Sequence, residues 1–473
     1  MFSDGNHIHF VGIGGAGVSG LARIALEAGH SVSGSDMKES TVTQGLRALG
    51  ASISIGHGRE NVPIGTALAV VSAAIKPENP EYAEAARRGL RVIKYSQALG
   101  ELTQLRESLC VCGTHGKTTT TAMLAQIMLA AGTSPSYLVG GEPKSLTSHA
   151  AWKDGRHFVV ESCEYDRSFL RLHPRVVILN NIEEDHLDCY GDIAGVEQGF
   201  ADFIARLPKD GLLLFNADDA RCAKLAAKTH RRAEGFGAAA SATWRMHELD
   251  ASTGFARARV SHSGKFLGAL ALEIPGRLNA INAMGALAAA CSAGVEPALA
   301  LSALKAYRGV ARRFECIGQI AGVPLIDDYA HHPTAVAHLI ETARKTFGKK
   351  RLVAVFQAHQ YARMNGMFDG FVDAFGDADR VLVARTYAAR ESGVVAGEPE
   401  RRFAKALRAR GVEAADYDDF AAIKQDLALK TAPSDVLIFI GAGDVNEIAY
   451  DLLNDRDFTS ARLHSLLKAE AAA

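Results

Sequence analysis

A glycine-rich loop between an apolar run and a helix start constrains the fold of this chain more than any other feature. Residues 108–112 are apolar enough for a buried strand, and the loop at 113–121, with the sequence GTHGKTTTT, leads into a helix-like run from Ala122. The free backbone N–H groups at such a helix start lie at the positive end of the helix dipole and suit a phosphate group. Lys117 adds a charge for the outer phosphates, and the Thr118 hydroxyl is placed to ligate a magnesium ion. We expect this segment to bind a nucleoside triphosphate within an α/β fold.

The loop is a shortened variant of the phosphate-binding pattern, because Val111 stands where the strict pattern has its first glycine. A threonine-rich cap on an ordinary helix would explain the threonines, but it would leave Gly-Lys-Thr at the strand-to-helix junction without a reason. We therefore favour a nucleotide site. The residues that we expect to contact ATP here are Gly113, Thr114, His115, Gly116, Lys117, Thr118 and Thr119.

A second glycine loop, at residues 12–17, follows a short apolar run and precedes a helical pattern. Gly12, Gly14 and Gly17 have the spacing of a nucleotide-binding βαβ unit, in which glycines permit a tight turn, close approach to a diphosphate and close helix packing. Asp36, at the end of the next strand-like run, is placed to accept hydrogen bonds from a ribose. The pattern does not choose among NAD, FAD and a UDP-sugar as the ligand.

Strand-like and helix-like segments alternate along most of the chain, and the strand-like runs are almost continuously apolar, for example residues 352–356 and 436–440. Such alternation predicts mostly parallel sheets with helices on both faces. A length of 473 residues exceeds what one hydrophobic core accommodates, and about three domains is the usual number. We therefore expect an N-terminal Rossmann-like domain at residues 1–107, a central P-loop ATPase-like domain at residues 108–312 and a C-terminal Rossmann-like domain at residues 313–473.

The charge balance and the cysteines narrow the class of protein. Lys and Arg total 52 against 53 for Asp and Glu, so no overall field attracts nucleic acid or an anionic membrane. The N-terminal residues lack the basic and apolar regions of an export signal, and no long apolar run suits a membrane span. Seven scattered cysteines without a C-x-x-C pair are expected to be reduced, with Cys110 and Cys112 as buried apolar residues rather than zinc ligands. We expect a soluble, cytoplasmic protein.

Two polar residues of the central domain, Glu161 and His186, each come shortly after an apolar run and are candidate metal ligands. Ligands in open α/β sheets bind beyond the carboxyl ends of the strands. If both strands neighbour the loop strand, these side chains reach the edge at which Lys117 and Thr118 hold phosphates. Magnesium prefers oxygen ligands, so Thr118 with a carboxylate is an ordinary site, while His186 suggests a second ion. A histidine that only caps a loop or packs in the core is the alternative.

Two further segments carry polar residues of interest. Asn279 and Asn282 share one face of a helix start, where they would either contact a purine or cap the helix. The segment 327–333, with the sequence DDYAHHP, ends an apolar run and places Pro333 in the first turn of a helix. Two acids, a tyrosine and two histidines exceed what a helix cap needs, so we expect this segment to contact a ligand.

These motifs, in this order, resemble those of the Mur ligase family, whose members form amide bonds with ATP during peptidoglycan synthesis. The resemblance covers nearly the whole chain and is closest to the branch that adds L-alanine. The motifs that carry it lie at residues 9–17, 34–36, 71–75, 113–121, 161–170, 181–190, 312–315, 327–333 and 441–444.

The resemblance implies a first domain that binds UDP-N-acetylmuramate, a central ATPase domain and a third domain that completes the ATP and amino-acid sites. The catalytic residues that it implies are Lys117, His186 and Glu161, and the Mg²⁺ ligands are Thr118, Glu161 and His186. The adenosine of ATP would contact Asn279 and Asp328. The residues that would contact the sugar nucleotide or the amino acid are Gly14, Gly15, Gly17, Asp36, Ser72, His115, Arg313, Tyr329, His331 and Arg363.

The activity that the resemblance implies is the joining of L-alanine to the lactyl carboxylate of UDP-N-acetylmuramate through an acyl phosphate, with release of ADP and phosphate. A ligase that attaches a preformed tripeptide is the alternative, because Tyr165 is typical of that branch. Gln360 stands where the alanine-adding branch usually has an arginine, which leaves Arg363 as the candidate partner of the amino-acid carboxylate. Residues 187–208 contain no lysine, which favours these two branches over those that use a carbamylated lysine.

Two interpretations outside the ligases use fewer of the motifs. An NAD-linked oxidoreductase would use the first glycine loop but neither Lys117 nor Glu161. A non-catalytic ATP-dependent switch would show no turnover that depends on an amino acid. For the oligomeric state we expect a monomer or a homodimer.

Overall fold

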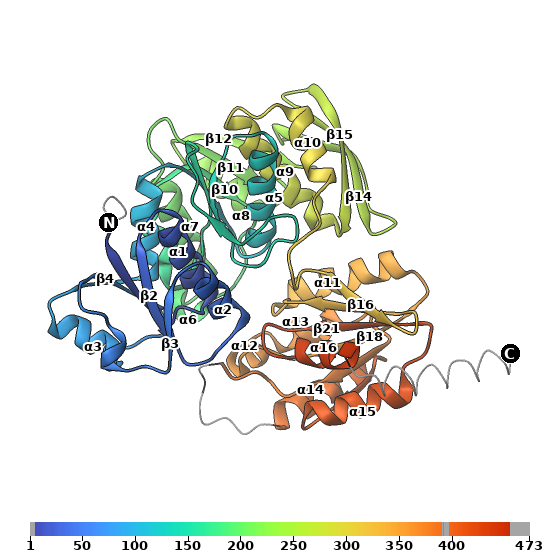
Figure 1. Cartoon of the computed structure of the whole chain (residues 1–473). Coiled ribbons are helices and arrows are strands. Elements are labelled where there is room, and N and C mark those ends of the chain that lie inside the picture. The colour runs from blue at the N-terminus through green and yellow to red at the C-terminus, as the bar shows by residue number, and fades with distance from the viewer. Residues whose placement is uncertain (1–4, 390, 392–396, 455–473) are drawn as a thin grey trace. The chain divides into compact units, whose positions relative to one another are not determined.

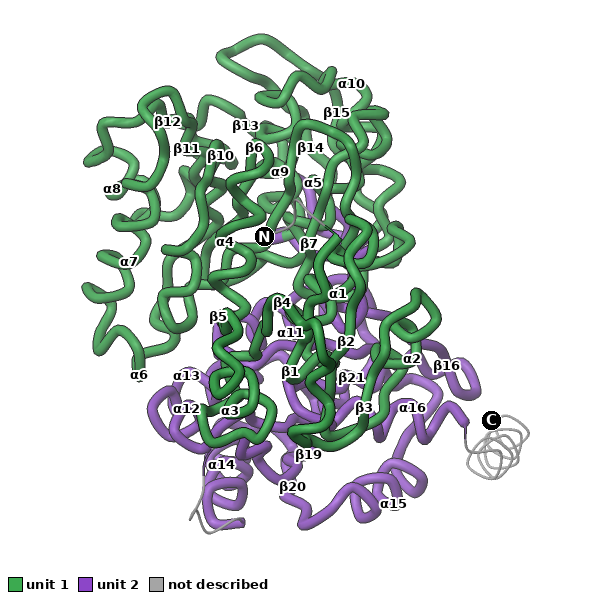
Figure 2. The backbone as a smooth tube through the Cα atoms, turned by 60° about the vertical axis from the view of Figure 1, so that its left-hand side comes forward, with its two compact units in different colours: residues 1–249, 257–273, 279–308 green, residues 250–256, 274–278, 309–473 purple. Residues whose placement is uncertain are grey.

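The computed structural model describes residues 5–389, 391 and 397–454 and contains three β-sheets with helices between their strands (Figure 1). The chain divides into two compact units (Figure 2). Unit 1 comprises residues 1–249, 257–273 and 279–308 and holds nearly all of the first two sheets, while unit 2 comprises the remaining residues and holds the third. The predicted α/β class with mostly parallel sheets is confirmed.

The first sheet has five parallel strands in the order β3-β2-β1-β4-β5. The chain leaves the central strand β1 for β2 on one side and later reaches β4 on the other, so the loop after β1 lies where the strand order reverses. Open α/β sheets bind their ligands at this position, and the glycine loop at residues 12–17 occupies it. The elements are β1 (His7–Val11), α1 (Ala16–Glu27), β2 (Ser31–Asp36), α2 (Thr41–Ala48), β3 (Ser52–Ile55), β4 (Thr66–Val71), α3 (Pro80–Arg87), β5 (Arg91–Lys94) and α4 (Tyr95–Gln104).

The second sheet has ten strands in the order β15-β14-β13-β12-β11-β10-β6-β9-β7-β8. Strand β6, which precedes the phosphate loop, pairs in parallel with β10 on one side and β9 on the other, so the carboxyl ends of these three strands meet at one edge. The strands before Glu161 and His186 thus neighbour the loop strand, which is the condition under which both side chains reach the phosphate-loop edge. The strands are β6 (Glu107–Cys112), β7 (Ser136–Leu138), β8 (Ala150–Ala151), β9 (His157–Glu161), β10 (Pro174–Leu179), β11 (Leu212–Asn216), β12 (Arg232–Gly237), β13 (Trp244–Asp250), β14 (Phe255–His262) and β15 (Lys265–Pro275).

The helices that accompany this sheet include one that is buried on nearly all sides. This helix, α5, follows the phosphate loop, and the side chains of Thr120 and Thr121 within it are fully buried. Thr121 satisfies its hydroxyl by donating to Lys117 O at 2.8 Å, so the threonines do not interrupt the packing. The helices are α5 (Lys117–Ala130), α6 (Leu187–Tyr190), α7 (Ile193–Ala205), α8 (Ala220–Lys228), α9 (Arg277–Ser292) and α10 (Pro297–Lys305).

The third sheet has six strands in the order β16-β17-β21-β18-β19-β20, with β16 antiparallel at one edge. Alternate residues of β18 enter two separate apolar clusters, so both faces of the sheet are covered, as the continuously apolar runs predicted. The elements are β16 (Glu315–Ile320), β17 (Val323–Asp328), α11 (Pro333–Phe347), β18 (Arg351–Phe356), α12 (Tyr361–Gly366), α13 (Phe368–Ala374), β19 (Arg380–Val383), α14 (Glu398–Ala409), β20 (Glu413–Asp416), α15 (Phe420–Lys430), β21 (Asp435–Ile440) and α16 (Asn446–Asn454).

The hydrophobic core of unit 1 continues from the first sheet into the second. One cluster of buried side chains includes Ile8 of β1, Leu138 of β7 and Phe158 of β9. A hydrogen bond from Trp152 N to Glu27 Oε2, at 2.7 Å, joins the end of α1 to the second sheet. The first two sheets therefore form one packed body.

Two of the cysteines lie in the core of the second sheet. All seven cysteines are free, and Cys110 and Cys112 are fully buried in β6. Burial raises the pKa of the Cys110 thiol to about 12, so this thiol stays protonated. Within the part of the chain that the structure describes, no helix combines the length and the apolar character that a membrane span requires.

Candidate functional site

The phosphate loop is held against the second sheet by a glycine and two asparagines. Helix α5 begins directly after Gly116, which has φ +77°, a conformation that glycine adopts without strain. A Cβ atom at this position would overlap Oδ1 of Asn282, so any side chain here would force the Asn282 amide to move. Asn181 Oδ1 accepts a hydrogen bond from the N–H of His115 at 2.7 Å. The loop backbone is therefore fixed, with the first N–H groups of α5 lacking partners within the helix.

Lys117 is partly buried at the start of α5 and uses all three of its N–H donors. Its Nζ atom lies 2.6 Å from Gly113 O, 3.1 Å from Thr114 O and 2.9 Å from Glu164 Oε1. Burial lowers the pKa of Lys117, but the charge of Glu164 outweighs burial and holds this pKa above its usual value. The side chain is therefore a permanent positive charge at the phosphate loop.

Thr118 and Glu161 form a hydrogen-bonded pair at the same edge. Thr118 Oγ1 donates to Glu161 Oε1 at 3.0 Å, and the N–H of Gly140 donates to Glu161 Oε2 at 2.7 Å. A hydroxyl and a carboxylate are the hard oxygen ligands that Mg²⁺ takes beside phosphate oxygens. The structure thus brings together two residues predicted as metal ligands, and their donor atoms fit a magnesium ion.

His186 lies beside two buried carboxylates. Its Nε2 atom is 4.0 Å from Glu164 Oε1 and 3.8 Å from Asp185 Oδ2, and one ligand atom from each of the three residues lies within 4.8 Å of the others. The ring of Tyr165 packs on the imidazole with 4.9 Å between the ring centroids. Since Glu164 also bonds to Lys117, this carboxylate connects His186 with the phosphate loop.

The segment after β10 also contacts the loop through Glu183. Its N–H donates to Thr114 Oγ1 at 2.9 Å, and its carboxylate Oε2 lies 3.3 Å from Nε2 of His115. His115 thus lies at the same edge as Lys117, as the sequence predicted. Its contact with a sugar nucleotide stays a prediction.

In the first sheet, Asp36 braces the glycine loop. The N–H of Gly14 donates to Asp36 Oδ2 at 2.8 Å, so this oxygen is engaged by the loop itself. Space at Gly17 is limited by Tyr95, because an added Cβ would lie 2.6 Å from the Tyr95 ring. Asp36, which the sequence predicted as a ribose acceptor, therefore also fixes the shape of the loop.

Ser72 and Gly15 complete the surroundings of this loop. Ser72 follows β4, and its N–H donates to Val11 O at 3.1 Å, which ties the end of β4 to the end of β1. The N–H of Gly15 donates to Gly12 O at 3.3 Å and closes the turn. The residues predicted to hold a sugar nucleotide in this domain are therefore gathered at one strand end.

In unit 2, contacts connect the three residues predicted for the amino-acid pocket in a row that includes His359. The ring centroids of Tyr329 and His331 are 5.5 Å apart, and those of His331 and His359 are 6.0 Å apart. Arg363 Nη1 lies 3.3 Å from His359 Nδ1. Gln360, the residue that departs from the alanine-adding pattern, has φ +72° at the start of α12. A left-handed backbone at a non-glycine residue is strained, and such strain is commonly found at ligand sites.

Arg313 and Asp328 flank Tyr329 in the same unit. The guanidinium of Arg313 lies 5.3 Å from the centre of the Tyr329 ring. Asp328 accepts hydrogen bonds from the N–H groups of Phe314 and Ala330, both at 2.7 Å, while its burial raises its pKa. Asp328 therefore holds the chain before β16 close to the end of β17, and its predicted contact with adenosine would use its remaining lone pairs.

Asn279 and Asn282 share one face of α9, as predicted. The side-chain N–H of Asn282 donates to Asn279 Oδ1 at 3.4 Å, and Asn282 is buried against Gly116. This pair places Asn279 one helical turn from the phosphate loop. Its contact with adenosine stays a prediction.

Three family models match the chain in order. The Mur ligase family, catalytic domain, matches residues 7–107, the Mur ligase middle domain matches residues 111–290, and the Mur ligase, glutamate ligase domain, matches residues 312–443. This chain belongs to the Mur ligase family. The resemblance drawn from the motifs is confirmed.

Individual relatives extend over almost the entire length of this Mur ligase. The UDP-N-acetylmuramate--L-alanine ligase of Anaeromyxobacter dehalogenans is 37% identical over 446 residues, which are 94% of this chain and 97% of the relative. Among solved structures, the UDP-N-acetylmuramate-alanine ligase of Thermotoga maritima is 28% identical with a TM-score of 0.81, covering 95% of this chain and 98% of that one. The murein peptide ligase of Psychrobacter arcticus is 26% identical with a TM-score of 0.72 at the same coverage.

Four residues at the sites of this Mur ligase were missed in the sequence. Glu164 follows Glu161 by three residues, and Gly140 follows β7, the strand beside β9. His359 comes shortly after β18, and Tyr387, whose ring stacks on His359 with 5.7 Å between centroids, comes shortly after β19. The rule that ligands bind beyond strand ends, applied to every strand, would have found all four.

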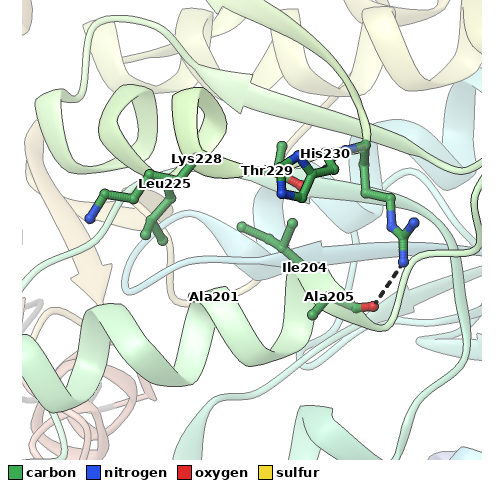
Figure 3. A pocket seen from close by; sticks show the side chains of 8 residues that line it. Ala201, Ile204, Ala205, Leu225, Lys228, Thr229 and His230 are labelled. Carbon is green, nitrogen blue, oxygen red and sulfur yellow. Dashed lines mark hydrogen bonds between the residues drawn. The ribbon is translucent and has the colours of Figure 1, made fainter.

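A hollow of about 270 Å³ lies elsewhere on this Mur ligase (Figure 3). Ile204 of α7 and Leu225 of α8 give it a mainly apolar lining, and Arg231 Nη2 donates to Ala205 O at 3.5 Å beside it. None of the predicted site residues contributes to this hollow. Its lining residues are Ala201, Ile204, Ala205, Leu225, Lys228, Thr229, His230 and Arg231.

Proposed function

We propose that this chain is an ATP-dependent ligase that joins L-alanine to the lactyl carboxylate of UDP-N-acetylmuramate, in the cytoplasmic synthesis of peptidoglycan precursors. The observation that carries the proposal is the phosphate-loop edge, where Lys117 and the Thr118–Glu161 pair meet, within a chain that matches a UDP-N-acetylmuramate--L-alanine ligase over 94% of its length. The coverage includes all three sheets, so the ATP and substrate regions are both represented. The relatives favour alanine addition over tripeptide addition.

The chemistry requires activation of a carboxylate. The lactyl carboxylate attacks the γ-phosphate of ATP and gives an acyl phosphate and ADP, and the amine of L-alanine then displaces phosphate through a tetrahedral intermediate. The permanent charge of Lys117 stabilises the transferring phosphoryl group, while the N–H groups of the loop orient it. A Mg²⁺ ion held by Thr118 and Glu161, with a second at His186, would neutralise the phosphate oxygens. Nothing in this sequence of steps requires a covalent bond to the enzyme.

The residue roles belong to the same proposal. The first glycine loop with Asp36 and Ser72 holds the sugar nucleotide, which His115 and Arg313 also contact. Asn279 and Asp328 contact adenosine, and Tyr329, His331 and Arg363 line the amino-acid pocket. The three domains are residues 1–107, 108–312 and 313–473, and the enzyme is a monomer or a homodimer, which light scattering distinguishes.

The amino-acid dependence of phosphate release tests the proposal. The purified protein with UDP-N-acetylmuramate, ATP and MgCl₂ should release phosphate only when L-alanine is added. An equal or stronger response to the tripeptide L-alanyl-γ-D-glutamyl-meso-diaminopimelate would identify the tripeptide, rather than L-alanine, as the substrate. Tight NADH binding without any release of phosphate would point instead to an oxidoreductase.

A further inference from the structure

A buried carboxylate beside the phosphate loop has no part in the roles given above. Glu164 is 2% exposed, and its Oε1 atom lies 2.9 Å from Lys117 Nζ and 4.0 Å from His186 Nε2. Its other oxygen, Oε2, is buried and accepts no hydrogen bond from any described residue. A buried carboxylate oxygen without a donor is unfavourable, so this oxygen is available to a further partner.

Lys117 cannot bind a phosphate in the arrangement observed, because its three N–H donors are all in use. Two of the acceptors, Gly113 O and Thr114 O, belong to the fixed loop backbone. The third, Glu164, is a side chain that can turn. Phosphate binding therefore frees Glu164, which leaves a buried negative charge that needs another cation.

The nearest groups that could share a cation with Glu164 are His186 and Asp185. One ligand atom from each of the three residues lies within 4.8 Å of the others. Metal–ligand bonds of about 2.0–2.2 Å set ligand atoms roughly 3–4 Å apart, so a small rotation of Glu164 suffices. Glu164 and Asp185 are two formal negative charges, which a divalent cation balances once the phosphates engage Lys117.

We propose that Glu164 exchanges partners: it holds Lys117 when the nucleotide is absent, and it joins His186 and Asp185 around a divalent cation when the phosphates of ATP engage Lys117. This inference rests on the proposed function, because it concerns the same ATP site. The hydroxyl of Tyr190 donates to the Glu164 carbonyl at 2.7 Å and ties its backbone to α6, which begins directly after His186. The exchange is thus a movement of the side chain alone.

The substitution Glu164→Gln gives two effects of opposite sign. Without metal, in EDTA, the affinity for ADP measured by calorimetry should rise about 3–10-fold, because the amide holds Lys117 less tightly than the carboxylate does. In the presence of ADP, the affinity for Mn²⁺ measured by electron paramagnetic resonance should fall roughly 10–100-fold, because a ligand is lost. The matched control is Asp166→Asn in the same segment, whose carboxylate is 58% exposed and 3.7 Å from Lys94; it should change neither affinity.

A fall in both affinities would mean that Glu164 only supports the fold, and unchanged affinities would mean that it has no role; either result overturns the proposal. If Glu164→Gln does not fold, Glu164→Asp keeps the charge but shortens its reach. It should still show the two opposite changes, each by a smaller factor, and changes of one sign would again overturn the proposal. Because both measurements use ADP and Mn²⁺ without an amino acid, they stay informative if the alanine dependence of phosphate release fails.

Discussion

The two glycine loops of this Mur ligase share a backbone arrangement but differ in the charges around it. Each follows a parallel strand flanked on both sides and leads into a helix. At the first loop, the charged side chain that bonds to the backbone is Asp36, and residues 12–17 contain no lysine. At the second loop, Lys117 lies directly after Gly116, with three carboxylates nearby. The two loops thus offer similar backbone N–H groups at a helix start, and they differ in the charged side chains that surround those groups.

The first loop also differs from the second in the buried carboxylate that supports it. Ser35 O accepts the N–H groups of Gly12 and Ile13, both at 2.9 Å, and Ser35 Oγ donates to the fully buried Glu81 at 2.5 Å. Asn61 Nδ2 also donates to Glu81, at 2.8 Å. This carboxylate has its hydrogen bonds satisfied, whereas Glu164 at the second loop has an oxygen without one among the described residues. A satisfied carboxylate stabilises a fixed loop, and an unsatisfied one suits a site that changes when ligands bind.

The largest expected effect comes from removing Lys117, the charge that distinguishes the second loop from the first. Lys117→Ala should lower kcat/KM for ligation about a thousandfold or more, because a positioned charge on the transferring phosphoryl group is lost. The measurement is phosphate release under saturating L-alanine. Since the variant leaves Glu164 buried without its cation, Lys117→Ala combined with Glu164→Gln should recover thermal stability while turnover stays low. Turnover near that of the unmodified enzyme would contradict the assignment.

Alanine substitutions at one glycine of each loop test whether the two loops bind separate ligands. Gly116→Ala should weaken ATP binding about 10–100-fold, since it introduces strain at φ +77° and overlap with Asn282, while UDP-N-acetylmuramate binding changes little. Gly17→Ala, which meets the Tyr95 ring, should have the reverse pattern. Gly45→Ala in α2 is the control, because no atom lies within 4 Å of the added Cβ. Both affinities measured by calorimetry should stay unchanged there, and equal losses of both ligands at Gly116 and Gly17 would refute separate loops.

Much of this comparison could be predicted from the sequence, because the signals are local. Glycine spacing, the apolar run before each loop and the position of Lys117 depend on neighbouring residues, and the strand at 108–112 and the helix after it were predicted nearly as found. The pairing of β6 with β9 and β10 was only a condition of the metal-site argument, because neither strand follows β6 directly in the chain.

The contacts of the charged side chains around the two loops could not be predicted, because they join residues far apart in sequence. Glu164 reaches Lys117 from 47 residues away, and Glu81 reaches Ser35 from 46 residues away. The edge strand β16 and the strand β20 were also missed, because their short runs are less continuously apolar than those of the central strands. The sequence shows which residues follow strands, but the side-chain partners depend on packing.

The hydrogen bonds of Glu81, the carboxylate that supports the first loop, should make the stability of the protein depend on pH. Burial raises the pKa of Glu81, but hydrogen bonds from His9, Ser35 and Asn61 outweigh burial and lower this pKa to about 2. Because the native pKa lies below the ordinary value of 4.5, the stabilisation is complete above pH 4.5 and is lost as the pH falls toward 2. Glu81→Gln should lower the free energy of unfolding by about 2 kcal/mol at pH 7 and by much less near pH 3, measured by urea denaturation. A difference that does not vary with pH would show that shape rather than charge is responsible.

The smallest expected effect concerns the brace within the first loop. Asp36→Ala removes the acceptor for the N–H of Gly14, so the affinity for UDP-N-acetylmuramate should fall roughly fivefold, about 1 kcal/mol, while the affinity for ATP stays the same. Asp36→Asn keeps an oxygen at this position and should restore most of the loss. Hydrogen exchange at the Gly14 amide separates the brace from a direct contact with the ribose, since it should accelerate in Asp36→Ala but not in Asp36→Asn. If both variants bind the sugar nucleotide equally weakly while the Gly14 amide stays protected, the negative charge of Asp36 contacts the ligand directly. The first loop would then use a charged side chain on its ligand, as the second loop does.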